Sequence, residues 1–207
     1  MFDRQPALIN LSSTLTEIFP GSEPANLEIY FVSAESNPNP QILLASEEHL
    51  PALAALAGDI WRQHYPGIIT SAQIEHMLAR MYALATLRDE LRRGIEFYRL
   101  LVAGRFVGFA SLGALPEPGA WKLHKLYLLP AFHGRGLGSR LLAFCESEAR
   151  RRGAQKLVLA VNKRNAKAIA AYERNGFRVA AAVVTDCGGG FVMDDFIMEK
   201  ALAVAGG

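Results

Sequence analysis

Three glycines at alternate positions, Gly134, Gly136 and Gly138, follow an apolar and aromatic run that ends at Pro130. The run over residues 123–129 fits a buried strand, which Pro130 ends because proline cannot donate to a sheet ladder. Behind the glycines, apolar residues recur at helical spacing: Leu137, Leu141, Leu142, Phe144, Cys145 and Ala149. The stretch therefore predicts a strand, a glycine loop and a helix.

This order of elements is suited to binding a phosphate. The first turn of a helix leaves N–H groups without intrahelical partners, and the positive end of the helix dipole favours an anion. Glycine lets the backbone approach the anion closely and adopt turn angles that a Cβ forbids. Arg135 adds a positive charge beside the loop. We therefore expect a phosphorylated ligand across residues 135–139.

The spacing of the glycines narrows the choice of ligand. A P-loop requires G-x-x-x-x-G-K-[ST] and the dinucleotide fingerprint requires G-x-G-x-x-G, whereas residues 134–138 read G-x-G-x-G with no lysine following. With the proline-terminated strand before it, the loop resembles the acetyl-CoA loop of the GNAT N-acetyltransferase superfamily, Q/R-x-x-G-x-G/A. His133 stands where Gln or Arg is usual. The alternative is a tight loop whose glycines serve only the turn.

A second motif lies about 25 residues further on, behind another predicted strand. Residues 165–177 resemble the N-x-x-A-x-x-x-Y-x-x-x-G-F stretch that follows the fifth strand in GNAT enzymes. Asn165 is either a helix N-cap alone or a cap that also contacts the ligand. Tyr172 is either a core residue or a hydroxyl that faces the cofactor. The two motifs together make the resemblance specific, and it extends over about residues 41–200.

The resemblance implies transfer of an acetyl group from acetyl-CoA, a co-substrate, to an amine. Backbone groups on the central strand would bind the pantetheine arm and hold the acetyl carbonyl, and the loop amides would hold the pyrophosphate. Tyr172 would be catalytic, giving its proton to the departing CoA sulfur, because an ordinary phenol has a pKa of about 10. The residues expected to bind acetyl-CoA are Leu126, Tyr127, Leu128, His133, Gly134, Arg135, Gly136, Leu137, Gly138, Ser139, Asn165 and Tyr172.

The general base is where the chain departs from its relatives. Many of them carry a glutamate at the position of Lys122, and others carry one at the position of Ala160. His124 lies two residues beyond Lys122, so both side chains should share one face of the strand, and an imidazole can deprotonate an ammonium. We therefore expect His124 to be the catalytic base, with a core histidine as the alternative. Further candidates for the substrate side are His64, Tyr65, Glu75 and His76.

Composition excludes several other classes of protein. The chain has 207 residues, of which 51% are apolar and 20% charged, and its formal net charge is only +2, so neither nucleic acid nor a membrane surface is an expected partner. Cys145 and Cys187 show no metal or redox spacing, and no His/Cys cluster predicts a metal site. Free thiols and the lack of a leader pattern predict a cytoplasmic protein. A homodimer stays open.

The predicted elements give an α/β fold, with a mixed sheet flanked by helices on both faces. Strands are expected at 41–45, 95–102, 106–112, 123–129, 156–161, 177–185 and 191–200, and helices at 46–63, 70–81, 84–94, 137–152 and 165–175. A crossover helix between the central strand and the next makes that pair parallel. The resemblance implies an otherwise mostly antiparallel GNAT sheet, with the parallel pair at the acetyl-CoA site.

The chain divides into an N-terminal extension of unknown role, residues 1–40, and an acetyltransferase domain, residues 41–202. The extension contains one possible strand at 27–32. We expect an acetyl-CoA-dependent N-acetyltransferase that modifies a primary amine of a small molecule by direct attack, similar to bacterial polyamine-type enzymes. The alternatives are acetylation of protein N-termini and a non-catalytic acyl-CoA sensor.

Overall fold

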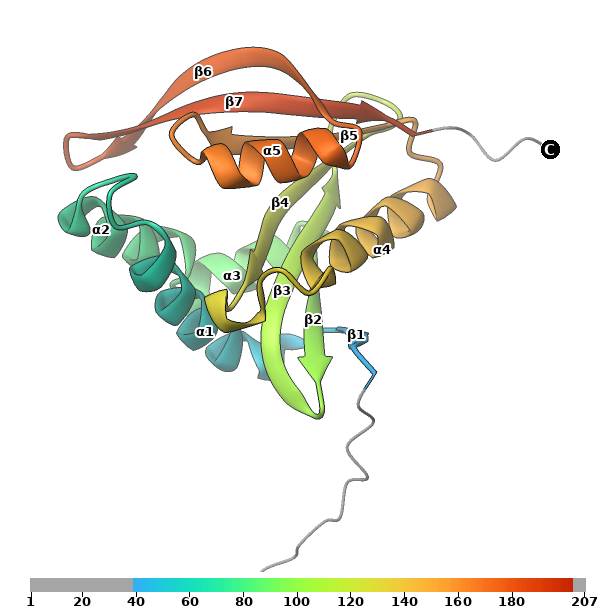
Figure 1. Ribbon diagram of the computed structural model, residues 1–207, viewed down its shortest axis with the longest axis horizontal. Helices are drawn as coiled ribbons and strands as arrows, with labels where there is room; N and C mark the ends of the chain where they lie inside the picture. The colour runs from blue at the N-terminus through green and yellow to red at the C-terminus, as the bar shows by residue number, and fades with distance from the viewer. Residues whose placement is uncertain (1–38, 203–207) are drawn as a thin grey trace, which may run out of the picture. The chain divides into compact units, whose positions relative to one another are not determined.

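The computed structural model describes residues 39–202. Its seven-stranded sheet has the order β1-β2-β3-β4-β5-β7-β6 (Figure 1). The strands are β1 (Gln41–Leu44), β2 (Glu96–Val102), β3 (Arg105–Ala114), β4 (Ala120–Leu128), β5 (Lys156–Asn162), β6 (Arg178–Gly188) and β7 (Phe191–Ala201). Every neighbouring pair is antiparallel except β4 and β5, which are parallel. This confirms the predicted fold class. The possible strand at 27–32 lies outside the described residues.

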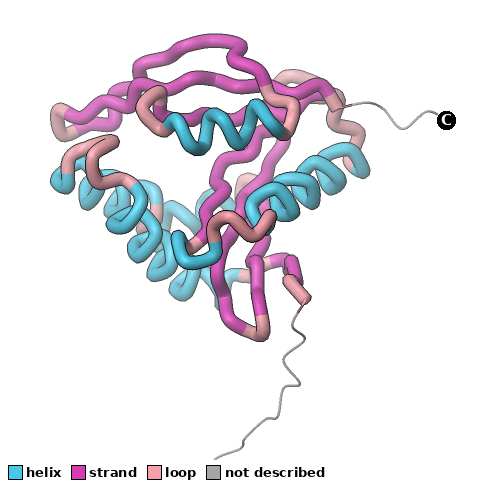
Figure 2. Tube along the Cα trace, viewed as in Figure 1, coloured by secondary structure: helices cyan, strands magenta, loops and turns pink. Residues whose placement is uncertain are grey.

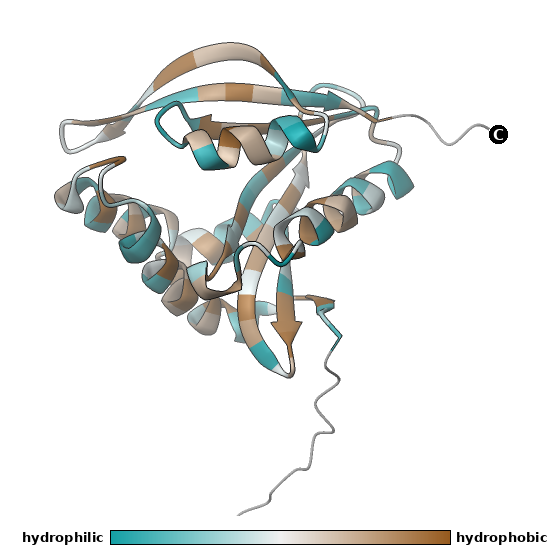
Figure 3. Ribbon diagram, viewed as in Figure 1, coloured by the Kyte–Doolittle hydropathy of each residue, from teal (hydrophilic) through white to brown (hydrophobic). Residues whose placement is uncertain are grey.

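Five α-helices in residues 39–202 cover the sheet (Figure 2). They are α1 (Leu50–His64), α2 (Ser71–Met81), α3 (Leu84–Arg92), α4 (Leu137–Arg151) and α5 (Ala166–Arg174). One apolar core packs α1, α2 and α3 against the sheet, around Trp61, Phe97 and Phe109. A second core packs α4 and α5 against it, around Leu141, Leu157 and Met198. The helices show alternating apolar and hydrophilic segments in Figure 3, as expected when one side of each helix is buried.

Local sequence explains where the first helices begin. Ser46 precedes a short 3-10 turn, Glu47–His49, and α1 starts only at Leu50, with Pro51 in its first turn. Proline suits that position because its missing N–H would have no helical partner there. Thr70 caps α2 as predicted, its hydroxyl accepting from the Gln73 amide over 3.2 Å. The Gln73 side chain does not complete a capping box; it donates to the Val192 carbonyl over 2.6 Å and so connects α2 to β7.

The parallel pair is short, and this positions the site. The ladder between β4 and β5 runs only from Ala120 opposite Lys156 to Lys122 opposite Val158. Beyond Lys122, β4 stays paired with β3 up to Leu128, while β5 stays paired with β7 up to Asn162. Beyond Lys122, the edge of β4 that faces β5 is therefore not paired with β5. The predicted acetyl-CoA residues of β4 lie in this unpaired stretch.

A β-bulge interrupts β4 at His124. Leu123 lies opposite Leu112 and Lys125 lies opposite Ser111, so His124 is the extra residue. The bulge breaks the simple alternation of side chains, and Lys125 turns to the α1–α3 face, where its ammonium pairs with Glu90 at 2.6 Å. The charge of Lys122 therefore acts on two consecutive residues, His124 and Lys125, which a strict period of two does not predict.

Candidate active site

The glycine loop is open on the side where a ligand would lie. Gly134 and Gly136 have φ of +75° and +72°, angles that favour glycine. A Cβ added at Gly134, Gly136 or Gly138 would meet no atom within 4 Å. Gly136 precedes α4 without a side-chain cap, so no side chain satisfies the first amides of that helix. These features fit a bound pyrophosphate.

Two hydrogen bonds and a cation–ring contact hold the residues around the loop. His133 Nε2 donates to the Leu128 carbonyl over 2.9 Å, which ties the loop to the end of β4. The Arg135 guanidinium lies 5.2 Å from the centre of the Phe132 ring. Ser139 Oγ accepts from Asn175 Nδ2 over 3.3 Å, so the start of α4 touches the end of α5. The loop and α5 thereby form one surface.

Backbone groups of Leu126, Tyr127 and Leu128 line the β4 edge beyond the parallel ladder. Their other edge is paired with β3, Leu126 opposite Ala110 and Leu128 opposite Gly108. Leu126 and Leu128 belong to the core beneath α4, whereas the Tyr127 ring lies in the α1–α3 core. The predicted pantetheine residues therefore border the opening between β4 and β5.

Tyr172 lies on α5 with its ring 5.8 Å from that of Phe177. Burial, and to a smaller extent Cys145, raises the pKa of Tyr172 to about 12, so the phenol is protonated at neutral pH. The ring packs against the core beneath α4, to which Leu126 and Leu128 of β4 also belong. A protonated phenol therefore lies on the same face of the sheet as the side chains of Leu126 and Leu128.

Asn165 and His64 join α5 to α1. Asn165 caps α5, its Oδ1 accepting from the Ala168 amide over 3.3 Å. Its Nδ2 lies 3.0 Å from His64 Nε2, and the His64 ring is 6.5 Å from that of His133. Burial lowers the pKa of His64, and the neighbouring His133 lowers it further. Asn165, His64 and His133, which are far apart in the sequence, are therefore neighbours in the structure.

Trp61 packs with three tyrosines, Tyr65, Tyr82 and Tyr127, on the α1–α3 side of β4. Its ring centroid lies 4.4 Å from Tyr65 and 5.9 Å from both Tyr82 and Tyr127. Burial raises the pKa of all three phenols well above the usual value, so they are neutral. Within the described residues, Trp61 Nε1 and Tyr82 Oη are buried without a hydrogen-bond partner. Tyr65, a candidate for the substrate side, is thus a buried member of this cluster.

His124 does not point freely into the opening. Its Nε2 lies 3.3 Å from the place of a Cβ on Gly113, next to the Ile95 side chain, and is buried without a hydrogen-bond partner in residues 39–202. Burial, then Lys122, Lys125 and Arg93, lowers the pKa of His124 to about 4. The imidazole is therefore neutral at pH 7 and a weak base. The base role of His124 stays a prediction.

The remaining candidates on the first two helices make structural contacts. Glu75 accepts from Arg62 over 2.7 Å, and both side chains are more than half exposed. His76 Nε2 donates to the Cys187 carbonyl over 2.9 Å and so ties α2 to β6. Together with Gln73, His76 fixes α2 to the β6–β7 hairpin.

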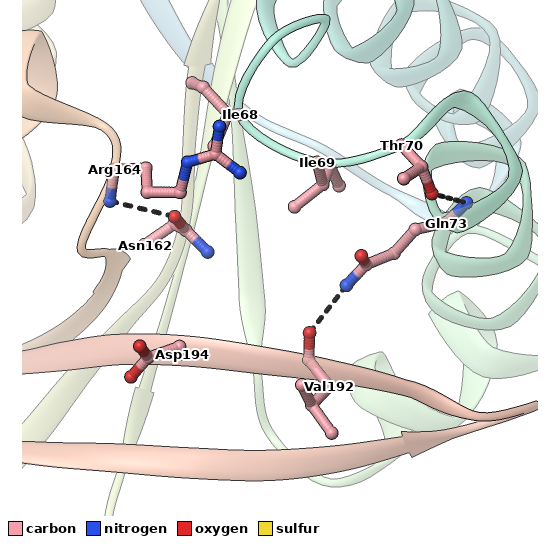
Figure 4. A pocket seen from close by; sticks show the side chains of 8 residues that line it. All are labelled: Ile68, Ile69, Thr70, Gln73, Asn162, Arg164, Val192 and Asp194. Atoms are coloured by element: carbon pink, nitrogen blue, oxygen red, sulfur yellow. Dashed lines mark hydrogen bonds between the residues drawn. The ribbon is translucent and has the colours of Figure 1, made fainter.

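A cavity of about 210 Å³ lies between the α1–α2 turn, the β6–β7 hairpin and the start of α5. Figure 4 shows Asn162 and Arg164 on one side of it and Thr70 and Gln73 on the other. Arg164 Nη2 donates to the Gly67 carbonyl over 2.7 Å, and the Arg164 amide donates to Asn162 Oδ1 over 3.0 Å. The lining residues are Ile68, Ile69, Thr70, Gln73, Asn162, Arg164, Val192 and Asp194.

Asp195 is a candidate site residue that the sequence analysis does not include. It lies in β7, for which the sequence predicts only a strand, and it is the cross-strand partner of Asn162. Asp195 Oδ1 is buried without a hydrogen-bond partner among the described residues. An acidic residue inside an otherwise apolar stretch of a strand was the available signal, but Asp194 beside it gave the same signal.

No helix in residues 39–202 is long and apolar enough to span a membrane. Nor do these residues bring together three His, Cys, Asp or Glu side chains in a group that could hold a metal ion.

The fold and the loop together define the acyl-CoA-dependent N-acetyltransferase class. Residues 54–177 match the Acetyltransferase (GNAT) family, which covers more than half of the chain. The chain belongs to the GNAT family and is an acetyltransferase, an enzyme that uses acetyl-CoA as its acyl donor. This confirms the resemblance read from the two motifs.

Three known proteins illustrate the similarity. Spermidine N(1)-acetyltransferase of Thermoplasma acidophilum is 29% identical over 165 residues, which span 77% of this chain and 96% of that protein. The structure of PaiA N-acetyltransferase from Thermoplasma acidophilum in complex with coenzyme A has a TM-score of 0.68 at 28% identity, covering 79% of this chain and 99% of that one. The ribosomal-protein-alanine N-acetyltransferase of Brucella melitensis has a TM-score of 0.59 at 26% identity, covering 78% and 99%.

Proposed function

We propose that this enzyme transfers an acetyl group from acetyl-CoA to a primary amine of a small, polyamine-like molecule by direct attack. The observation that carries the proposal is the small cavity of about 210 Å³ at the end of β5, where Asn162 lines it. Ligand pockets commonly enclose about 300–1,000 Å³, so this space suits a slender acceptor. The similarity to a spermidine N(1)-acetyltransferase over nearly its full length supports the same class of acceptor.

The acyl donor would be held by groups that the fold leaves available. Amides of residues 134–139 would bind the pyrophosphate, because α4 begins there without a side-chain cap. Backbone groups of Leu126, Tyr127 and Leu128 would bind the pantetheine arm along the free β4 edge. A backbone N–H at the same edge would stabilise the developing oxyanion, an effect worth about 3 kcal/mol in comparable sites. Bound acetyl-CoA supplies the activated acyl group.

Tyr172 would give its proton to the departing sulfur. The phenol stays protonated at neutral pH because burial raises the pKa of Tyr172 to about 12. Asn165 would hold the start of α5 beside the arm through its cap and its bond to His64. His124, the base expected from the sequence, would have to act with a pKa lowered to about 4. A homodimer and a cytoplasmic location stay predictions.

One alternative acceptor has a specific observation in its favour. The similarity to a ribosomal-protein-alanine N-acetyltransferase at 26% identity makes the N-terminus of a protein the second candidate. The similarity to the spermidine acetyltransferase is higher, 29% identity over nearly the full length of that protein, and the hydrogen bond between Gln73 and Val192 narrows one side of the cavity. We therefore favour the small amine.

The test is acceptor-dependent release of the CoA thiol. Purified protein with acetyl-CoA is given spermidine, a simple monoamine, or a peptide with an N-terminal alanine, with an amine-free control for hydrolysis. The proposal predicts fast release with spermidine and slow release with the peptide. Release with the peptide alone would favour the N-terminal acetyltransferase. Tight acetyl-CoA binding without release for any amine would favour a sensor.

A further inference from the structure

Asp195 lies on the face of the sheet that packs against α1, α2 and α3. On β7 it lies two residues from Met193, which packs against the α1–α3 core and contacts Gln73 Nε2 at 3.6 Å. Across the strand its partner is Asn162, whose side chain lines the cavity. Asp195 is not itself a lining residue of the cavity, but its position brings a carboxylate next to two residues that are, Asn162 across the strand and Asp194 in the chain.

The carboxylate of Asp195 lacks a partner within the protein. Six side-chain polar atoms in residues 39–202 are buried without a hydrogen bond, and Asp195 Oδ1 is the one carboxylate oxygen among them. Leaving such an atom unsatisfied destabilises the folded protein, and a charged group more than a neutral one. Folded proteins rarely keep this cost without a ligand, a water or a function.

Three charged neighbours act on Asp195. Burial and Asp194 raise the pKa of Asp195, whereas Lys122 of β4 and Lys163, just after β5, lower it by less, so the net pKa is raised. Burial raises the pKa of Tyr65, the C-cap of α1, and Asp195 in turn raises it further. The ammonium of Lys163 is already paired with Asp194. Among the described residues no cation forms an ion pair with Asp195, so the carboxylate is available to an external one.

Resting on the proposed function, we propose that Asp195 is a catalytic residue, the carboxylate that binds the acceptor's ammonium group and removes its proton. In this step R–NH3+ gives one proton to Asp195 and becomes R–NH2. The nitrogen lone pair forms the N–C bond to the thioester carbonyl, and the C–S bond breaks with its electron pair on sulfur. Tyr172 protonates the sulfur and is reprotonated by the proton that the new amide nitrogen loses. Asp195 releases its proton to solvent.

The experiment compares Asp195→Asn with Glu199→Gln, which changes a carboxylate of the same strand that pairs with Arg178. Spermidine binding is measured by calorimetry on CoA-saturated protein, and kcat/KM is measured from pH 6 to 10. We expect Asp195→Asn to weaken spermidine binding at least about tenfold and to lower kcat/KM at pH 7 about 100-fold or more. The deficit should shrink as pH rises toward the pKa of the free amine, near 10. Glu199→Gln should behave as wild type.

The Asp195→Asn variant counts as folded if its acetyl-CoA affinity and its melting temperature are unchanged or higher than those of the wild type. Asp195→Ser, smaller and also neutral, gives the same comparison if the asparagine variant does not fold. An active wild type with an equally active Asp195→Asn variant and an identical pH profile overturns the role of Asp195 alone. A wild type that binds acetyl-CoA without amine-dependent thiol release overturns the proposed function, and the role of Asp195 with it.

Discussion

Asn165 Nδ2 and His64 Nε2 lie 3.0 Å apart, so the cap of α5 is hydrogen-bonded to the last residue of α1. Asn165 Oδ1 already accepts from the Ala168 amide, and Nδ2 can only donate, so His64 must present an unprotonated Nε2 to it. Burial keeps the imidazole in this state by lowering the pKa of His64. One contact therefore sets both the position of α5 and the protonation of a histidine beside the glycine loop.

Replacing the amide by a carboxylate should reverse that protonation. Asn165→Asp retains an oxygen for the Ala168 amide, so the helix cap is kept, but a carboxylate beside His64 favours the imidazolium. We expect the pKa of His64 to rise, measured by NMR titration, with its resonance assigned by its loss in His64→Gln. An unchanged titration in Asn165→Asp would contradict the contact.

Tyr172→Phe should lower kcat about 100-fold at neutral pH, because proton transfer by a positioned group commonly contributes that much. The ring keeps its packing against Phe177, so acetyl-CoA affinity and stability should not change. Tyr98→Phe is the control, since it removes a hydroxyl from β2 that bonds to Glu96 and Arg152. Full kcat in a folded Tyr172→Phe variant that binds CoA would show that another group protonates the sulfur.

Gly138→Ala separates stability from binding. Gly138 is the second residue of α4, its φ is not positive, and an added Cβ would meet no atom within 4 Å outside its own helix backbone. Alanine should therefore stabilise the protein by about 0.5 kcal/mol. The same methyl group would stand where the pyrophosphate approaches the first turn, so we expect acetyl-CoA affinity to fall about tenfold or more. Thermal melting measures the change in stability and calorimetry the change in affinity. A stabilised variant with unchanged acetyl-CoA affinity would contradict binding of the pyrophosphate at Gly138.

His124 should make the fold sensitive to acid. Its folded-state pKa is lowered from 6.5 to about 4, so below pH 6.5 the unfolded chain takes up a proton before the folded one does. The free energy of unfolding therefore falls as pH decreases from about 6.5 to about 4, by roughly 2 kcal/mol after allowing for the partial exposure of the ring. In His124→Asn the free energy of unfolding should fall by that much less over this range, measured by urea unfolding at pH 7 and pH 4.5. Equal losses in both proteins would contradict the lowered pKa.

The strands, the helices and the glycine loop could be predicted because their signals are local. Pro130 ends a strand, Gly136 requires a positive φ, and Thr70 and Asn165 cap helices through atoms three residues away. Each of these features is decided by a few neighbouring residues, whatever the rest of the chain does.

The electrostatic part of the site could not be predicted in the same way. The bulge at His124 depends on its register with β3, and it turns Lys125 toward Glu90, a residue 35 positions away. The environment of Asp195 depends on Asn162 across the strand and on Lys122 of β4. Contacts of this kind follow from sheet register, which hydrophobic periodicity alone does not specify.

The most direct test of the central claim is the fate of a labelled acetyl group. The protein is incubated with acetyl-CoA that carries carbon-13 at the acetyl carbonyl, together with spermidine, and the carbonyl signal is followed by NMR. We predict that the thioester signal is replaced by an amide signal at the rate of thiol release. Label that stays in the thioester, or appears only as free acetate, would contradict acetyl transfer to the amine.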